Sequence, residues 1–331
     1  MGNYDAAMDP ENPNSSQVQL ALLVGEDKHV LDVGCWRGDL GRFLRAVGCK
    51  VVGVDVDEAA AAKASAILDE VVVADVDETP LTALFAGQAF DVVVFGDVLE
   101  HLKNPEAVLK DAVSLLAPDG RIVVSLPNVA HGALRLALLQ GRWQTTPEGL
   151  LDETHLHFYS REGLLDLLDA AGLQADELRG VVLDPLGTEV KVDADSLPIG
   201  VVEWVRNQPD ALVYQFLVSA SIVPEGREAV HSTRIQYAVH PDDVRFQDRY
   251  TDQAVNAARE ALRVKDHVLG LQAEATAAKY RADREAKRRA RLEDRLDAQN
   301  GLIARQRRRI ARLERKGFVG FLRRFKRKLA G

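Results

Sequence analysis

Cysteine is scarce in this sequence, because Cys35 and Cys49 are the only two among 331 residues. Two thiols supply neither a disulfide framework nor a cysteine zinc cluster. The N-terminus lacks a basic segment followed by an apolar core, and no apolar run reaches the length of a membrane span. These absences argue against a disulfide-stapled secreted domain and against an integral membrane protein, so we expect a cytoplasmic protein.

The small net charge of −8 hides two segments of opposite sign. Residues 281–331 have 19 basic and 6 acidic side chains, a net charge of +13, whereas residues 1–280 have 23 basic and 44 acidic, a net charge of −21. With 47% hydrophobic residues, the chain is long enough to bury one full core and leave a large remainder. We therefore expect one acidic globular domain and a basic appendage.

Apolar runs of strand length alternate with helix-like segments such as Glu58–Leu68, Pro105–Leu116 and Arg161–Ala171. Continuous apolar strands separated by helices predict an α/β fold with a parallel sheet covered on both faces. The last apolar run follows only loop-like sequence after Asp184, so we expect it to pair antiparallel. The runs begin at His29, Lys50, Val71, Phe90, Gly120, Arg179 and Ala211.

The segment HVLDVGCWRGDLG, from His29 to Gly41, predicts a buried strand, a tight turn and the start of a helix. Glycine at Gly34 and Gly38 permits positive φ and close approach of a ligand, and the helix start offers unpaired amide groups. The same pattern also occurs in turns that bind nothing. Asp55 ends the next strand about 20 residues later, where an acidic side chain binds ribose hydroxyls in nucleotide-binding folds. The two features together favour a nucleotide-type site.

The glycine spacing lacks the G-x-G-x-x-G pattern of dinucleotide-binding folds, which argues against a nicotinamide-dependent dehydrogenase. The segment instead resembles motif I of class I S-adenosylmethionine-dependent methyltransferases, (D/E)-x-G-x-G-x-G, with Trp36 in place of the middle glycine. This resemblance implies a Rossmann-like seven-stranded sheet with an antiparallel last strand, and S-adenosylmethionine as the cofactor. The resemblance also implies an acidic residue near the adenine, for which Asp75 is the first candidate and the adjacent acid Asp77 is the alternative. The implied cofactor-binding residues are Asp32, Gly34, Cys35, Trp36, Gly38, Asp55, Val56, Asp75, Val76, Gly96 and Asp97.

The segment FDVVVFGDVLEHL, from Phe90 to Leu102, resembles a motif of small-molecule methyltransferases. The resemblance places Asp97 at the cofactor edge, with Glu100 and His101 opening the next helix. His101 is a catalytic candidate, and capping or packing is an equal alternative for it. The D-P-P-(Y/F) motif of many amino-group methyltransferases is absent from this segment, which favours oxygen as the methyl acceptor.

Residues 127–164 resemble a bacterial methyltransferase subgroup associated with polysaccharide and glycan assembly. The resemblance implies that this region lines the acceptor site. A sugar hydroxyl benefits from a general base, and histidine suits that role near neutral pH. We predict His155 as the base and His131 as the second choice, with structural hydrogen bonding as the alternative for each. No metal site is predicted, because the region lacks helix-fixed ligand spacing. Its polar candidates are His131, His155, His157, Asp152 and Glu153.

The sequence therefore predicts a methyltransferase that O-methylates a saccharide or glycan precursor. Two alternatives remain open: a methyltransferase for another small hydroxylated metabolite, and an inactive scaffold that recruits glycan-assembly enzymes. The predicted parts of the chain are a mobile arm at 1–16, the methyltransferase domain at 17–223, a linker at 224–254, a coiled coil at 255–316 and a basic amphipathic tail at 317–331.

A 3-4 spacing from Val268 to Leu313 predicts a homo-oligomeric coiled coil, since ten of its 14 core positions are apolar. A single solvated helix is the alternative. In the tail, aromatic and basic residues separate onto different faces of a helix, which favours peripheral binding to an anionic membrane over nucleic acid. Docking of the tail on the acidic domain is the other possibility. The apolar positions of the tail are Phe318, Phe321, Leu322, Phe325 and Leu329.

Overall fold

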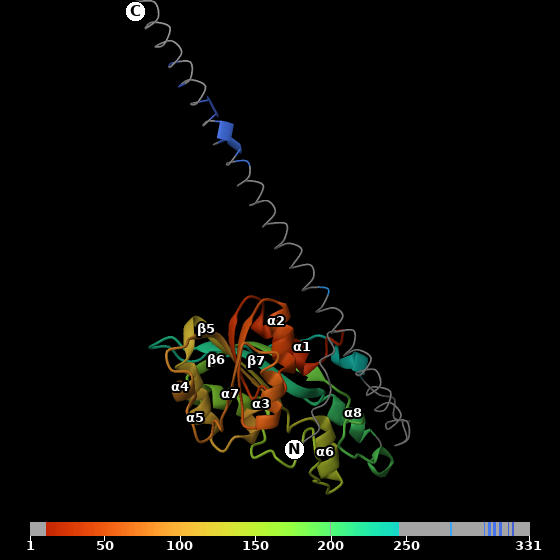
Figure 1. Ribbon diagram of the computed structural model, residues 1–331. Coiled ribbons are helices and arrows are strands. Elements are labelled where there is room, and N and C mark those ends of the chain that lie inside the picture. The colour runs from red at the N-terminus through yellow and green to blue at the C-terminus, as the bar shows by residue number, and fades with distance from the viewer. Residues whose placement is uncertain are drawn as a thin grey trace, which may run out of the picture. The chain divides into compact units, whose positions relative to one another are not determined.

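The computed structural model describes residues 11–198 and 200–244 and ten isolated positions beyond them (Figure 1). The chain divides into two units, residues 1–275 and residues 276–331. The ten isolated positions are helical, and the rest of the predicted coiled coil and tail lies outside the described residues. Those positions are 279, 301, 304, 305, 307, 308, 311, 312, 317 and 320.

The first unit is built on a mixed sheet that contains eight described strands, in the order β3-β2-β1-β4-β5-β7-β6-β8 (Figure 1). The strands from β3 to β5 in this order are parallel, and β7 lies antiparallel between β5 and β6. The strand bounds are β1 His29–Val33, β2 Lys50–Asp55, β3 Glu70–Val73, β4 Phe90–Gly96, β5 Leu116–Pro127, β6 Leu173–Val182, β7 Val213–Ile222 and β8 Ile235–Tyr237.

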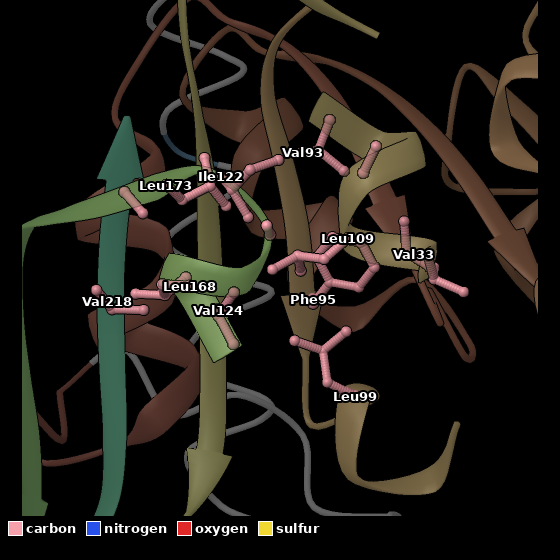
Figure 2. Packing of buried hydrophobic residues seen from close by; sticks show 14 of the residues in the cluster. Val33, Val93, Phe95, Leu99, Leu109, Ile122, Val124, Leu168, Leu173 and Val218 are labelled. Carbon is pink, nitrogen blue, oxygen red and sulfur yellow. The ribbon is translucent and has the colours of Figure 1, made fainter. Parts of the chain in front are cut away.

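The sheet is apolar on both faces, which explains why its strands appear as continuous apolar runs. Val30 and Val92 pack in the cluster that includes α1, α2 and residues around α3, while Leu31 and Val93 pack in the cluster of α4, α5 and α7. In Figure 2, Leu109 and Leu168 approach the strands in the second cluster. The helix bounds are α1 Ser16–Val24, α2 Asp39–Ala46, α3 Glu58–Ala64, α4 Leu81–Leu84, α5 Pro105–Val113, α6 Gly132–Leu139, α7 Arg161–Ala170 and α8 Val201–Arg206.

The predicted α/β fold and the antiparallel last long strand are confirmed, and three details are corrected. The core does not close at Val223, because β8 pairs with β6 inside the predicted linker. The loop-like stretch before β7 contains the short helix α8. Part of the predicted mobile arm is fixed, since the Asn14 side chain donates to the Val182 carbonyl at 2.7 Å and accepts from its amide at 3.0 Å. None of the described helices combines the length and apolar character needed to cross a membrane.

Candidate active site

The turn after β1 contains three residues with left-handed backbone conformation. Gly34, Trp36 and Gly38 have φ of 73°, 46° and 81°. The amides of Gly34 and Cys35 both donate to the Val54 carbonyl, at 2.8 and 3.1 Å, which ties the turn to the end of β2. A Cβ atom at Gly34 would overlap the Val98 side chain, so glycine is needed there for space as well as for φ.

The Asp55 side chain holds this turn in place. Its Oδ2 accepts from the Trp36 amide at 2.7 Å, and its Oδ1 accepts from the Asp57 amide at 2.8 Å. The first bond helps to stabilise a left-handed φ that a bulky side chain rarely adopts. Each carboxylate oxygen can accept a second hydrogen bond, so Asp55 can still bind ligand hydroxyls. The structure thus gives Asp55 a role in shaping the turn that the sequence did not predict.

Asp32 lies buried on β1 beneath this turn. Burial, followed by the nearby charge of Asp55, raises the pKa of Asp32 to about 7. Burial and then the charges of Asp32 and Asp55 also raise the pKa of the Cys35 thiol. The Cys35 thiol is therefore protonated at neutral pH, which excludes it as a nucleophile and leaves a packing role beside Gly53.

Asp97 follows β4 on the neighbouring strand, at the point where the strand order reverses between β1 and β4. It has a φ of 58°, and its Oδ1 accepts from the Ser125 hydroxyl at 2.6 Å and from the Gln215 side-chain amide. Burial raises the pKa of Asp97, and the bonds from Ser125 and Gln215 oppose that shift. Gly96 and Asp97 therefore lie at the same edge of the sheet as the Gly34 turn.

Two acidic residues after β3 were candidates for an adenine contact. Asp77 is used within the protein, because its carboxylate accepts from the amides of Lys103 and Asn104 at 3.0 and 3.3 Å. Asp75 is exposed and its Oδ1 accepts from the Asp77 amide. The geometry favours Asp75 over Asp77 as the ligand contact, with exposed Val56 and half-buried Val76 as its predicted companions.

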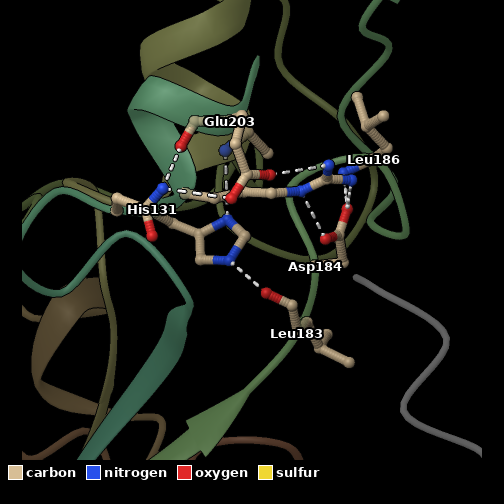
Figure 3. Close-up of polar contacts among 8 residues, drawn as sticks. His131, Leu183, Asp184, Leu186 and Glu203 are labelled. Atoms are coloured by element: carbon tan, nitrogen blue, oxygen red, sulfur yellow. Dashed lines mark hydrogen bonds and ion pairs between the residues drawn. The ribbon is translucent and has the colours of Figure 1, made fainter. Parts of the chain in front are cut away.

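His131 belongs to a structural network. It is fully buried, its Nε2 lies 3.0 Å from the Leu183 carbonyl, and its Nδ1 accepts from the Ala133 amide at 3.3 Å as the N-cap of α6 (Figure 3). Burial lowers the pKa of His131 to about 4. Because both ring nitrogens are engaged, the geometry favours the structural alternative over proton transfer at His131.

His101 and His155 do come together, although they are 54 positions apart in the sequence. Their ring centroids lie 4.7 Å apart, and the His155 side chain is only 3% exposed. Burial, followed by His101, lowers the pKa of His155 to about 4. His155 is thus neutral near pH 7, and its role as a base stays a prediction. His157 lies beside Tyr159, with ring centroids 6.1 Å apart.

Glu100 is a buried acid for which the sequence predicted no role in binding or catalysis. Its side chain is 1% exposed, and neither carboxylate oxygen has a hydrogen-bond partner. Burial and the charges of Asp97 and Asp152 raise the pKa of Glu100 well above its ordinary value. Its place directly before His101 was the available clue, but burial of Glu100 depends on the loop of residues 155–157, whose amides Leu156 and His157 donate to its backbone carbonyl.

Aromatic side chains extend the site beyond His155. The Phe158 ring lies 6.1 Å from the His155 ring and 5.8 Å from the Trp143 ring, measured between centroids. Trp143 and Phe158 are 47% and 42% exposed, and neighbouring Leu156 is 57% exposed. This surface next to the two histidines is suited to contact with a ring-shaped or apolar molecule.

Comparison with known proteins places the chain in a family. Residues 12–178 match the family described as a methyltransferase domain. A ubiquinone biosynthesis O-methyltransferase of Azorhizobium caulinodans is 34% identical over 176 residues, which cover 50% of this chain and 67% of the relative. One from Cereibacter sphaeroides is 30% identical over 186 residues, covering 55% and 74%. A solved S-adenosylmethionine-dependent methyltransferase from Archaeoglobus fulgidus is 19% identical with a TM-score of 0.44, covering 64% of this chain and 96% of that one.

Proposed function

The chain belongs to the methyltransferase domain family, and on that premise we propose that it methylates a hydroxyl group of a small metabolite. It is an S-adenosylmethionine-dependent methyltransferase. The observation that best supports a cofactor at the carboxyl edge of the sheet is the Gly34 turn held by Asp55. This turn leads into α2, whose N-terminus has no side-chain cap, and it is held by a carboxylate able to accept from ribose hydroxyls.

The acceptor would lie on the side of Glu100, His101 and His155, beside the aromatic surface. Methyl transfer is an in-line displacement, so the protein mainly has to align the acceptor oxygen with the methyl group and exclude water. The oxygen forms a bond to the methyl carbon as the carbon–sulfur bond breaks, and the hydroxyl proton leaves. The products are a methyl ether, S-adenosylhomocysteine and a proton.

Oxygen as the acceptor atom is supported by the names of the relatives, which are O-methyltransferases of ubiquinone biosynthesis. Those relatives do not support the glycan-associated subgroup that the sequence predicted. The exposed Trp143, Leu156 and Phe158 favour an acceptor with an aromatic ring or apolar part. A saccharide remains the second candidate, because residues 127–164 resemble the glycan-associated subgroup and sugar rings also stack on aromatic side chains.

A direct assay separates these acceptors. The full chain is incubated with methyl-labelled S-adenosylmethionine and either a catechol or a saccharide panel, and methyl ethers are identified by mass spectrometry. We expect methylation of the phenolic acceptor. Methylation of saccharides alone would move the assignment to the glycan-associated subgroup. Tight cofactor binding without transfer to either class of hydroxyl would contradict the proposal.

A further inference from the structure

Three side chains from two distant segments converge at the acceptor side of the site. Glu100 and His101 belong to the short 3-10 helix Leu99–His101, and His155 belongs to the loop between α6 and α7. One nitrogen or oxygen atom from each of the three lies within 4.8 Å of the others. We propose that Glu100, His101 and His155 bind a divalent transition metal ion.

Glu100 is the strongest observation for a ligand. Its carboxylate is buried and has no hydrogen-bond partner, and the Nε2 atom of His155 lies 4.0 Å from Oε1. A separation of 4.0 Å is too long for a hydrogen bond. In a tetrahedral site, metal bonds of about 2.0–2.2 Å place two ligand atoms roughly 3.3–3.6 Å apart, so these two side chains would move a few tenths of an ångström closer to share one ion. A bound cation would compensate the buried carboxylate.

The hydrogen bonds of His101 determine which of its ring nitrogens has a free lone pair. The Thr154 hydroxyl donates its single hydrogen to Asp152 at 2.6 Å, so it can only accept from His101 Nδ1, 3.0 Å away. The Thr154 carbonyl, 3.3 Å from the same nitrogen, also accepts only. Nδ1 of His101 therefore bears the hydrogen, and Nε2 has the lone pair that binds an ion. Such a bond at the remote nitrogen is the usual support of a metal-bound histidine.

The donor set defines the class of ion. Two imidazoles and one carboxylate suit zinc, manganese or iron(II), whereas magnesium and calcium prefer oxygen ligands. Three protein ligands leave an open coordination position. If the proposed function holds, the acceptor hydroxyl occupies that position, and the ion lowers the pKa of the hydroxyl so that its proton leaves before the methyl transfer. Binding of the ion itself does not depend on the proposed function.

Calorimetry with the full chain tests the site. The protein is stripped with a chelator and titrated with zinc, manganese or magnesium chloride alone. We expect one zinc or manganese ion per chain and at least tenfold weaker binding of magnesium. Glu100→Gln should weaken zinc binding at least tenfold, since it removes the anionic ligand without changing the volume. Glu153→Gln is the matched control, because Glu153 is an exposed acid in the same loop as His155 and is not one of the three proposed ligands.

Thermal unfolding gives a second measurement. Zinc should raise the midpoint of unfolding of the wild type and of Glu153→Gln, and should leave that of Glu100→Gln unchanged. If Glu100→Gln does not fold by circular dichroism, His101→Gln provides the same comparison. Absence of zinc and manganese binding to the wild type, or equal zinc affinity in the folded variant, would overturn the site. These measurements need no acceptor, so an ion that binds while methyl transfer fails would reject only the proposed function.

Discussion

Gly34 must satisfy two demands, a φ of 73° and the absence of a side chain next to Val98. Gly172 has the same φ, and open space lies where its Cβ atom would be. A substitution at Gly172 therefore measures the cost of the left-handed backbone alone. We predict that Gly172→Ala lowers the free energy of unfolding by about 1–2 kcal/mol, the cost of left-handed backbone. Gly34→Ala should cost more, because it adds the overlap with Val98.

Urea unfolding of both variants measures the difference between these two losses. The double substitution Gly34→Ala, Val98→Ala should recover part of the extra loss, because it removes the overlapping methyl groups. Equal losses in Gly34→Ala and Gly172→Ala would show that Val98 does not restrict the turn.

Asp32 should make stability depend on pH. Its pKa is about 7 in the folded protein and 3.8 ordinarily, so between these values the folded state holds a proton that the unfolded chain releases. The free energy of unfolding should therefore fall as pH rises from about 4 to 7, with about 4 kcal/mol contributed by Asp32. We predict a shallower fall in Asp32→Asn, measured by urea unfolding at pH 4.5, 5.5 and 7 without cofactor. Parallel pH curves for the two proteins would contradict the raised pKa.

The position of several site residues at the carboxyl edge of the sheet was predictable from sequence, because each one lies at the end of a strand or in the turn directly after it. Asp32, Gly34, Asp55 and Asp97 all lie at the carboxyl edge of the sheet, where their position in parallel strands puts them. Glu100 could not be recognised in this way. Its side chain is buried by a loop more than 50 residues later in the sequence, and no local pattern encodes that contact.

The element α8 is anchored to the loop after β6 by a buried ion pair. Arg206 donates through Nε and Nη2 to the Asp184 carboxylate at 2.8 and 3.1 Å, and both side chains are at most 3% exposed (Figure 3). Asp184→Asn would replace the two short charged hydrogen bonds of the buried guanidinium by contacts to a neutral amide, while the longer 3.5 Å contact from Nη1 to Glu203 remains. We predict a loss of about 3 kcal/mol in the free energy of unfolding. Asp195→Asn, at an exposed acid of the same connection, should change it by less than about 0.5 kcal/mol. Comparable losses in the two variants would show that the ion pair is not what holds α8.

The long strands and helices could be predicted from apolar runs, because both faces of the sheet are covered. The short elements could not be predicted in this way. The three residues of β8 pair with the edge of β6 through backbone groups, which any sequence provides, so the segment IQY gave no pattern. The six residues of α8 pack through Val202 and Val205 on α6, a contact made between two separate connections. Elements of this size are fixed by tertiary packing more than by local preference.

The predicted coiled coil concerns the whole chain and lies mostly outside the described residues. If its core positions associate, the full chain should form a dimer of twice 36.3 kDa at micromolar concentration. A version ending at Val244 should be monomeric, because it lacks every one of those positions. Light scattering of both proteins measures their masses, and a monomeric full chain would refute the coiled coil.

The basic tail is a separate proposal. Its five apolar positions and its cluster of arginine and lysine residues should bind the full chain to anionic vesicles. We predict that the full chain floats together with such vesicles, whereas a version ending at Lys316 stays behind in the unbound fraction. Neutral vesicles are the control, since they lack the charge that attracts the basic residues. Equal recovery of both proteins with anionic vesicles would reject the tail as the anchor.

The position of β7 also has a consequence for biosynthesis. β5 and β6 are synthesised before β7, the strand that lies between them in the sheet. Their edges that face β7 therefore stay unpaired until Ile222, the last residue of β7 and 40 residues after Val182, has been made. At about 5–20 residues per second, a ribosome leaves the edge of β6 unpaired for roughly 2–8 seconds and that of β5 for roughly 5–19 seconds. This interval exposes the nascent domain to mispairing, so chaperone binding during translation should be strongest between completion of β6 and emergence of β7.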